Sequence, residues 1–211
     1  MKKKITRPCD NGQMPKIVDH EARRTQLADA VGRVIVREGV NEVSIRSVAA
    51  EAGWSPGALR HYFTTRDEML AFACEQVIEQ VTARITNMRH TGTIHQAVRD
   101  TLLETMPIDA QRHAEAAVAF AFLTLGLSDP RLAEVQRTQF DSMYGLCLQI
   151  IENLDTEGLL APHTASTELL AQRLHAIVDG LSIQRLAGHL TPELMIIQLD
   201  AYLAEIIHAG D

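Results

Sequence analysis

The sequence lacks both the dense cysteines of a secreted scaffold and the long apolar runs of a membrane protein. Its 211 residues include three cysteines, Cys9, Cys74 and Cys147, which lie far apart. An odd number of dispersed cysteines argues against a disulfide framework or a cysteine metal cage, and a cytoplasmic location is the simplest expectation. The richest apolar stretch, 116–127, is shorter than the ~18–20 residues of a membrane span. No signal-like apolar segment follows the lysines at 2–4.

Motifs for catalysis and cofactor binding are also missing. The chain contains no G-x-S-x-G, no P-loop and no G-x-G-x-x-G after a strand, and no pair of its nine histidines has a spacing typical of zinc sites. We therefore expect no catalytic residues, no cofactor and no metal. An all-α enzyme or a lipid-handling bundle without DNA binding is kept as the alternative, and turnover without DNA binding would support it.

Positive charge is concentrated near the N-terminus. Residues 1–66 hold 12 Lys or Arg and 7 Asp or Glu, a net +5, whereas residues 67–211 hold 8 and 20, a net −12. This asymmetry indicates a polyanion-binding end joined to a part with another task, although a basic tail and chance would also explain it. The polar segment 1–15 contains Pro8, Gly12 and Pro15, and we expect it to be a disordered basic arm.

Apolar residues recur at helical spacing along most of the chain, and no useful length alternates with period two. Breaks at Gly and Pro separate expected helices at 93–105, 110–127, 129–154, 166–188 and 192–208, after four helices between 19 and about 92. The sequence predicts an all-α fold of about nine helices. Its domains are a three-helix helix-turn-helix domain at 16–66 and a bundle at 67–211 for ligand binding and dimerisation.

The segment 44–67 has the ingredients of a helix-turn-helix. Ser44 and Ser55 are placed to cap two short helices, the second of which is expected to run to about Phe63. Gly53 suits the tight turn between them, and Thr65 with Glu68 forms a capping box for a longer helix. The second helix of such a motif enters the major groove of DNA. A motif that engages protein instead of DNA is a further alternative, which a flat salt dependence with DNA would favour.

Small residues at the start of the second helix allow close approach to DNA, and the long donor of Arg60 suits the O6 and N7 acceptors of guanine. Trp54 and Phe63 are expected in the core. The residues expected to contact bases are Ser55, Gly57, Ala58, Arg60 and His61. Those expected to hold phosphates are Ser44, Arg46, Tyr62, Thr65 and Arg66.

Two parts of the chain resemble a known family. The first part carries the pattern Ser44-Ile45-Arg46-Ser47-Val48-Ala49, Gly53, Ser55-x-Gly57-x-Leu59-x-His61-Tyr62-Phe63-x-Thr65-Arg66-Asp67-Glu68-Met69-Leu70. Through this pattern, about residues 20–72 resemble the DNA-binding domain of TetR-family transcriptional regulators. The second part resembles the BetI-type C-terminal domain in three stretches: Ala119-Phe120-Ala121-Phe122, Ser128-Asp129-Pro130-Arg131-Leu132 and residues 173–181. Arg60 and Trp54 depart from the usual family residues, so no operator sequence carries over.

The resemblance implies a one-component regulator that binds a pseudo-palindromic double-stranded operator as a homodimer and responds to a small molecule, with repression as the default mechanism. The helices at 166–188 and 192–208 are apolar over a wide arc, which fits a four-helix dimer interface or, alternatively, a deeply buried pair in a monomer. The expected interface residues are Leu174, Ile177, Leu181, Ile197 and Leu203.

The effector site is expected inside the bundle, among mostly apolar side chains with a few polar groups. The candidate ligand residues are Phe120, Leu123, Phe140, Tyr144, Cys147, His175 and Asp179, and ordinary core packing is the alternative for each. The acidic C-terminal part hints at a cationic ligand, although surface carboxylates explain that charge equally well.

Overall fold

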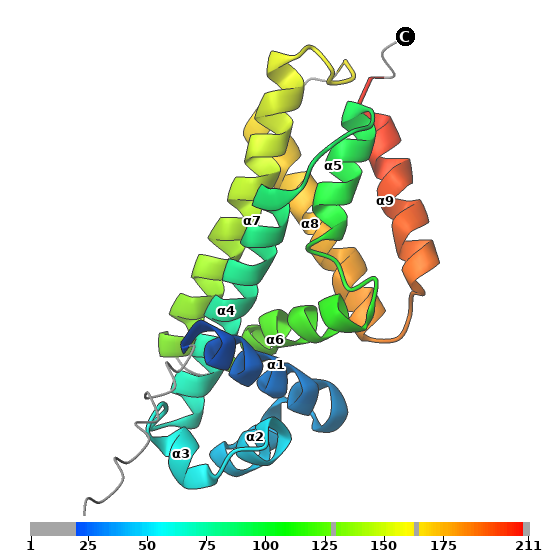
Figure 1. The fold of residues 1–211 in the computed structure, drawn as a ribbon. Helices are drawn as coiled ribbons and strands as arrows, with labels where there is room; N and C mark the ends of the chain where they lie inside the picture. Colours follow the sequence, from blue (N-terminus) through cyan, green and yellow to red (C-terminus); the bar gives the residue numbers. More distant parts are fainter. Residues whose placement is uncertain (1–19, 128–129, 163–164, 209–211) are drawn as a thin grey trace, which may run out of the picture.

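The computed structural model describes residues 20–127, 130–162 and 165–208, and helices dominate this part of the chain (Figure 1). The predicted all-α fold is confirmed, while the predicted arm at 1–15 lies outside the described residues. The nine α-helices of the described part are α1 (His20–Glu38), α2 (Ile45–Ala52), α3 (Pro56–Arg60), α4 (Arg66–Asn87), α5 (Ile94–Leu103), α6 (Ala110–Gly126), α7 (Pro130–Thr156), α8 (Thr167–Leu186) and α9 (Pro192–Ile206). A short 3₁₀ turn, η1 (Val40–Glu42), precedes α2.

Glycines and capping side chains set the ends of the N-terminal helices. Gly39 and Gly53 follow α1 and α2 with φ of 92° and 72°, a backbone conformation that side chains with a Cβ rarely adopt. Pro56 occupies the first turn of α3, where its missing N–H is harmless. The tight turn that the sequence predicted at Gly53 is therefore confirmed.

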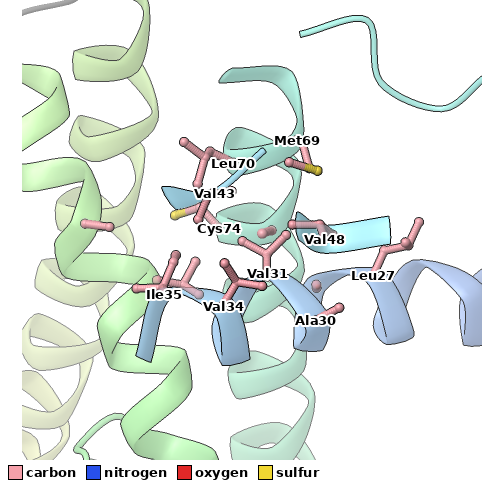
Figure 2. Packing of buried hydrophobic residues seen from close by; sticks show 14 of the residues in the cluster. Leu27, Ala30, Val31, Val34, Ile35, Val43, Val48, Met69, Leu70 and Cys74 are labelled. Carbon is pink, nitrogen blue, oxygen red and sulfur yellow. The ribbon is translucent and has the colours of Figure 1, made fainter. Parts of the chain in front are cut away.

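The first hydrophobic core joins α1, α2 and α3 to the beginning of α4 (Figure 2). Val31, Val48, Leu59 and Met69, one from each helix, have no exposed surface. The same cluster also takes in Phe122 of α6, so it extends well beyond residue 66, where sequence analysis ended the DNA-binding domain. Burial of this shared surface ties the helix-turn-helix to the bundle.

A second hydrophobic core fills the space between α5, the second half of α7, α8 and α9. Its fully buried members include Leu102, Ile151, Leu174 and Leu199, one from each helix. Figure 1 shows α6 lying across the base of the bundle, between the long helices and α1. A single bridge between Leu160 and Ile207 closes the far end. No helix of the described chain is long and apolar enough to cross a membrane.

One helix is shorter than its sequence pattern indicates. We expected the third helix to reach Phe63, but α3 ends at Arg60 and a turn follows. The N–H groups of Tyr62 and Phe63 both donate to the carbonyl of Leu59, at 2.9 and 3.1 Å. This tighter turn brings the Phe63 ring into the core, where it lies 5.0 Å from the ring of Phe72. Burial of the ring thus replaces a further helical turn.

Candidate nucleic-acid interface and ligand cavity

Three hydroxyl side chains cap the helices around the turn, as the sequence predicted. The oxygens of Ser44, Ser55 and Thr65 accept hydrogen bonds from the N–H groups of Ser47, Ala58 and Glu68, each at 3.1 Å. The Glu68 carboxylate accepts in return from the Thr65 N–H at 3.2 Å, which completes the predicted capping box. A hydroxyl whose oxygen accepts from the backbone can still donate its proton to a phosphate.

The outer surface of α3 is open to solvent. Ser55, Gly57, Arg60, His61 and Tyr62 are exposed. Ala58 is half-buried, and Leu59 is fully buried against α2. The helix therefore presents one polar face while an apolar anchor holds it, as docking into a groove requires. Beside α3, Arg46 and Thr65 are exposed and Ser44 is half-buried.

Arg66 is turned toward the protein. Its Nε donates to the carbonyl of Val43 at 2.8 Å, and its Nη2 donates to the carbonyl of Val40 at 2.5 Å. These bonds fasten the beginning of α4 to the segment before α2. The sequence suggested only a phosphate contact for Arg66, because a partner more than 20 residues away leaves no local pattern.

An arginine that sequence analysis missed lies beside the candidate DNA contacts. The guanidinium of Arg23 on α1 lies 5.5 Å from the ring centre of Trp54, a cation–π distance. The Trp54 ring in turn meets Tyr62 edge-on at 5.5 Å. Arg23, Trp54, His61 and Tyr62 border one surface hollow. Trp54 is half-buried and acts as a support between α1 and the end of α3.

A cavity of about 340 Å³ lies inside the bundle, between α4, α6, α7 and α8. Side chains of α4 form one wall at a spacing of four residues, with Val77, Val81 and Ile85 in one row. Exposed Thr82 and Ser142 also border the cavity, which places its opening between α4 and α7. The further lining residues are Ile78, Thr86, Glu104, Thr105, Arg112, Glu115, Ala116, Ala119, Phe120, Gln139, Met143, Leu146, Gln149, Val178, Asp179 and Ser182.

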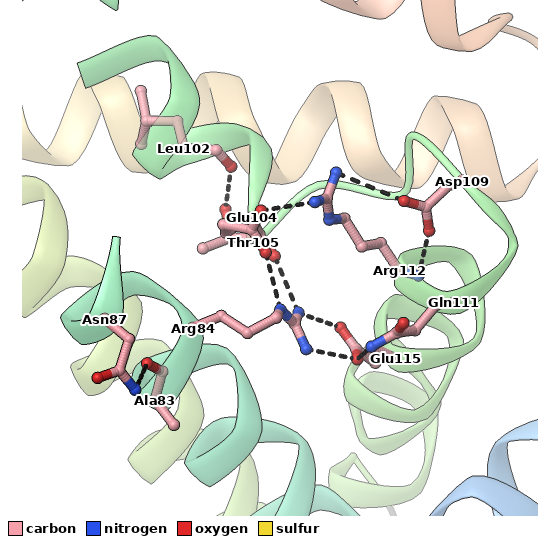
Figure 3. A network of polar contacts seen from close by, with 10 residues as sticks. All are labelled: Ala83, Arg84, Asn87, Leu102, Glu104, Thr105, Asp109, Gln111, Arg112 and Glu115. Atoms are coloured by element: carbon pink, nitrogen blue, oxygen red, sulfur yellow. Dashed lines mark hydrogen bonds and ion pairs between the residues drawn. The ribbon is translucent and has the colours of Figure 1, made fainter. Parts of the chain in front are cut away.

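Three lining residues of this cavity, Glu104, Arg112 and Glu115, belong to a network of ion pairs (Figure 3). Arg84 of α4 binds Glu115 of α6 through two nitrogens, at 2.6 and 2.8 Å, and reaches Glu104 at 2.7 Å. Arg112 holds the other oxygen of Glu104 at 2.5 Å. The two carboxylate side chains are only 13% and 10% exposed, so each needs a charged partner. The hydrogen bonds to Glu115 and Glu104 raise the pKa of Arg84, against the opposing effect of burial.

The same network reaches the DNA-binding part through α6. A Cβ added to Gly32 of α1 would lie 3.5 Å from the Cβ of Ala114, so the two helices pack closely. Burial raises the pKa of Asp29 on α1; Arg33 lowers it, and the negative charge of Glu115 raises it further. Glu115 therefore faces the cavity, α4 and α1.

The structure brings together only part of the predicted ligand site. Phe120 and Asp179 line the cavity, whereas Leu123, Phe140, Tyr144, Cys147 and His175 are not among its lining residues. Cys147 is fully enclosed by the second core, and burial, reinforced by the charge of Asp179, raises the pKa of its thiol to about 12. The Phe140 ring packs edge-on against His175 at 5.8 Å. The α4 wall was missed, although its four-residue repeat was visible in the sequence.

The predicted interface residues also separate into two groups. Leu174 and Leu203 are fully buried in the second core, so they support the protomer itself and not a surface for a partner. Ile197 is 59% exposed, and Ile177 and Leu181 border a surface groove between α8 and α9. The apolar arc is as wide as predicted, but its inner and outer members could not be separated by sequence spacing.

A capped helix-turn-helix with an exposed second helix, fused to a hollow helical bundle, defines a one-component DNA-binding regulator. Comparisons with known proteins agree. Residues 27–72 match the family model for bacterial regulatory proteins of the tetR family, and residues 95–208 match the BetI-type transcriptional repressor C-terminal model. The chain belongs to the TetR family of transcriptional regulators, with a C-terminal domain of BetI type.

Individual relatives cover most of the chain. The HTH-type transcriptional regulator PksA of Bacillus subtilis (strain 168) is 39% identical over 171 residues, which are 81% of this chain and 82% of PksA. The nicotine-responsive repressor HdnoR of Paenarthrobacter nicotinovorans is 27% identical over 190 residues, 87% of this chain and 95% of HdnoR.

Solved structures share the whole architecture. A transcriptional regulator from Rhodococcus sp. Rha1 superposes with a TM-score of 0.74 at 28% identity, covering 89% of this chain and 99% of that one. A regulator from Saccharomonospora viridis, solved in complex with choline, has a TM-score of 0.77 at 21% identity over the same shares of the two chains. The second likeness is one of fold alone.

Proposed function

We propose that this regulator binds a pseudo-palindromic operator as a homodimer and represses by occluding a promoter, and that a small molecule in the bundle cavity releases it. The observation that carries the proposal is the position of α4. Its first half, including Met69 and Leu70, belongs to the core of the DNA-binding part, and its second half, including Val81 and Ile85, lines the cavity. A ligand that moves α4 therefore also moves the helix that carries the reading residues.

The proposed dimer face is the outer side of α8 and α9. Three large apolar residues of these two helices, Ile183, Leu194 and Ile197, expose 43–59% of their surfaces. Exposed apolar side chains that gather on one face favour an interaction surface. The groove beside them is bordered by small residues, such as Gly180 and Ala201, that allow two helix pairs to approach. A two-fold axis there would combine four helices and place two copies of α3 ~34–36 Å apart, one turn of DNA.

Each proposed DNA contact has a role set by its chemistry. Arg60 donates to a guanine in the major groove, with Ser55, Gly57, Ala58 and His61 around it. Ser44, Arg46, Tyr62 and Thr65 hold phosphates, and helix N-termini strengthen that contact. Arg66 contributes positive charge near the phosphates while its hydrogen bonds fix α4 to the segment before α2.

The relatives support an effector of small size. HdnoR is named for its response to nicotine, and the Saccharomonospora regulator was solved with choline. The effector shifts the DNA-binding equilibrium only through its difference in affinity for the two conformations. The proposal assigns no catalytic role, as befits a family of transcriptional regulators, and it includes a cytoplasmic location, where the protein can reach its operator.

Fluorescence anisotropy tests the proposal with labelled duplex from the DNA upstream of the protein's own gene. A scrambled duplex of the same composition is the control, at ~150 mM salt, near physiological screening. We expect tight, salt-dependent binding to the native duplex alone. Equal weak binding to both duplexes, and to sites enriched from a random pool, would contradict a sequence-specific regulator. Turnover of a substrate without DNA binding would support the enzyme alternative.

A further inference from the structure

The cavity carries a charge imbalance once its ion pairs are counted. Glu104 and Glu115 are neutralised by Arg84 and Arg112, at 2.5–2.8 Å. The cavity is lined by a third carboxylate, Asp179 of α8, which belongs to no arginine pair among the described residues. The two arginines and three carboxylates leave one negative charge, which is unfavourable in a partly enclosed site.

A histidine one helical turn away lies beside Asp179. Nε2 of His175 lies 3.2 Å from Oδ2 of Asp179, but this nitrogen makes no hydrogen bond within the described part of the protein. The Asp179 side chain is 26% exposed, less than a typical surface carboxylate. Because Asp179 lines the cavity and no described arginine or lysine pairs with it, its carboxylate can bind a cation that enters the cavity.

A buried hydroxyl group, that of Ser182, lies near Asp179 on the same helix. Ser182 lies three residues further along α8, also lines the cavity, and is 1% exposed. Its Oγ has no hydrogen-bond partner among the described residues. A buried hydroxyl that makes no hydrogen bond costs free energy, which a ligand supplying a donor or an acceptor would recover.

The rest of the lining specifies the shape and charge of that ligand. Phe120, Met143, Leu146 and Val81 offer an apolar wall on three other helices. An anionic ligand would have to take Arg84 or Arg112 away from Glu104 and Glu115. That exchange would leave a largely buried carboxylate without a partner, at a cost of several kcal/mol. The paired arginines thus disfavour anions, and the apolar wall disfavours small, fully polar ions.

We propose, building on the proposed function, that the effector is an amphipathic amine: a protonated primary or secondary ammonium group held by Asp179 and Ser182, with an apolar body against Phe120 and Met143. The Asp179 carboxylate accepts one N–H and balances the charge. The Ser182 hydroxyl oxygen accepts a second N–H. A quaternary ammonium has the charge but no N–H, so it satisfies Asp179 and leaves Ser182 without a partner.

Four probes with one n-hexyl chain separate these contributions: n-hexylammonium, n-hexyltrimethylammonium, hexan-1-ol and hexanoate. Calorimetric titration of each into the full-length protein, without DNA, measures binding at the cavity itself. We expect n-hexylammonium to bind most tightly and hexanoate to show no binding. Hexanoate binding as tightly as the amine would overturn the proposal.

Substitutions assign the preference to the two residues. Asp179→Asn keeps the shape of the side chain but loses its charge. It should weaken the binding of n-hexylammonium by roughly tenfold or more, because a charge-assisted contact is lost, and should have little effect on the binding of hexan-1-ol. Ser182→Ala should weaken the binding of n-hexylammonium by roughly threefold to tenfold and leave the binding of n-hexyltrimethylammonium unchanged. Asp155→Asn, an exposed position near the end of α7, is the matched control and should change neither. Equal losses for charged and neutral probes in Asp179→Asn would contradict the assigned charge contact.

The anisotropy assay separates this proposal from the proposed function. If n-hexylammonium binds through Asp179 but leaves the operator complex intact even at saturation, the proposed ligand class is supported. The proposed release of DNA by a ligand in the cavity is then contradicted. If an anionic or neutral compound releases DNA and its effect survives Asp179→Asn, release stands and the amine class is overturned.

Discussion

The helix-turn-helix and the cavity hold their polar side chains in place over different distances along the chain. The caps of α2, α3 and α4 join residues three apart, such as Ser55 with Ala58. The ion pairs at the cavity join residues 20 and 31 apart, through Arg84 with Glu104 and Glu115. The first kind of contact needs only a local turn, while the second exists only after α4, α5 and α6 have packed. The caps of the helix-turn-helix are therefore set locally, whereas the hydrogen bonds of Arg66 and the ion pairs at the cavity depend on the tertiary structure.

The largest expected effect contrasts two apolar residues of α9. Leu203→Asp should leave little folded protein, because an unpaired carboxylate in a fully buried site costs several kcal/mol of a total stability of about 5–15 kcal/mol. Ile197→Asp should keep the helical fold, because Ile197 is 59% exposed, and should convert dimers to monomers. Circular dichroism and sedimentation velocity measure the two outcomes. A folded Leu203→Asp protein, or an intact Ile197→Asp dimer, would contradict this division of α9.

The next contrast compares a buried ion pair with an exposed one. Arg84→Met should lower the free energy of unfolding by about 2–3 kcal/mol, below the range for full burial because Arg84 is 27% exposed. Arg137→Met is the control, since the Arg137–Glu134 pair is 63% and 76% exposed and should contribute under about 0.5 kcal/mol. Urea denaturation monitored by circular dichroism measures both. Similar losses in the two variants would remove the structural role of the network.

A third contrast concerns two arginines of the DNA-binding part. Arg60→Ala should cost ~1–3 kcal/mol at the specific operator and relax base preference at one position. Arg46→Ala should weaken binding to the specific and scrambled duplexes alike. It should also reduce the slope of log affinity against log salt concentration by about one unit, as expected for a phosphate contact. Anisotropy titrations at several salt concentrations measure both effects. An unchanged ratio of specific to non-specific affinity in Arg60→Ala would exclude Arg60 from base readout.

The smallest effect has opposite signs at two glycines. Gly53→Ala should destabilise by about 1 kcal/mol, because a Cβ is strained at φ of 72°. Gly145→Ala should stabilise by about 0.5–1 kcal/mol, because Gly145 is exposed within α7 and an added Cβ meets nothing within 4 Å. Thermal and urea unfolding give the two signs. Destabilisation by Gly145→Ala would show that α7 has a contact beyond the protomer.

The elements that could be predicted are those with local causes. Ser44, Ser55 and Thr65 were recognisable as caps because a cap needs one hydroxyl and a helix beginning three residues later. The end of α3 was misplaced by three residues, because the burial of the Phe63 ring depends on Phe72 of another helix. The base and phosphate contacts remain predictions about a complex.

The lining of the bundle cavity was only partly predictable. Phe120 and Asp179, which the sequence suggested as ligand residues, line the cavity, whereas its other lining residues, such as Glu115, Ser182 and the α4 wall, were not expected. A polar residue within the apolar stripe of a helix can have a hydrogen-bond partner on another helix or can face a cavity. The sequence looks the same in both cases. For a similar reason, sequence analysis assigned both Leu203 and Ile197 to the dimer interface, although Leu203 is buried and Ile197 is exposed.

By itself, the sequence determined the all-α fold, the capped helix-turn-helix and the membership in a family of DNA-binding regulators, because spacing, caps and glycine turns act within a few residues. The tertiary structure alone decided which carboxylates pair with arginine, that Asp179 does not among the described residues, that the buried Ser182 hydroxyl lacks a hydrogen-bond partner there, and that α4 belongs to both the DNA-binding core and the cavity wall. Those facts depend on helices far apart in the chain, whose side chains meet only when the two cores have packed.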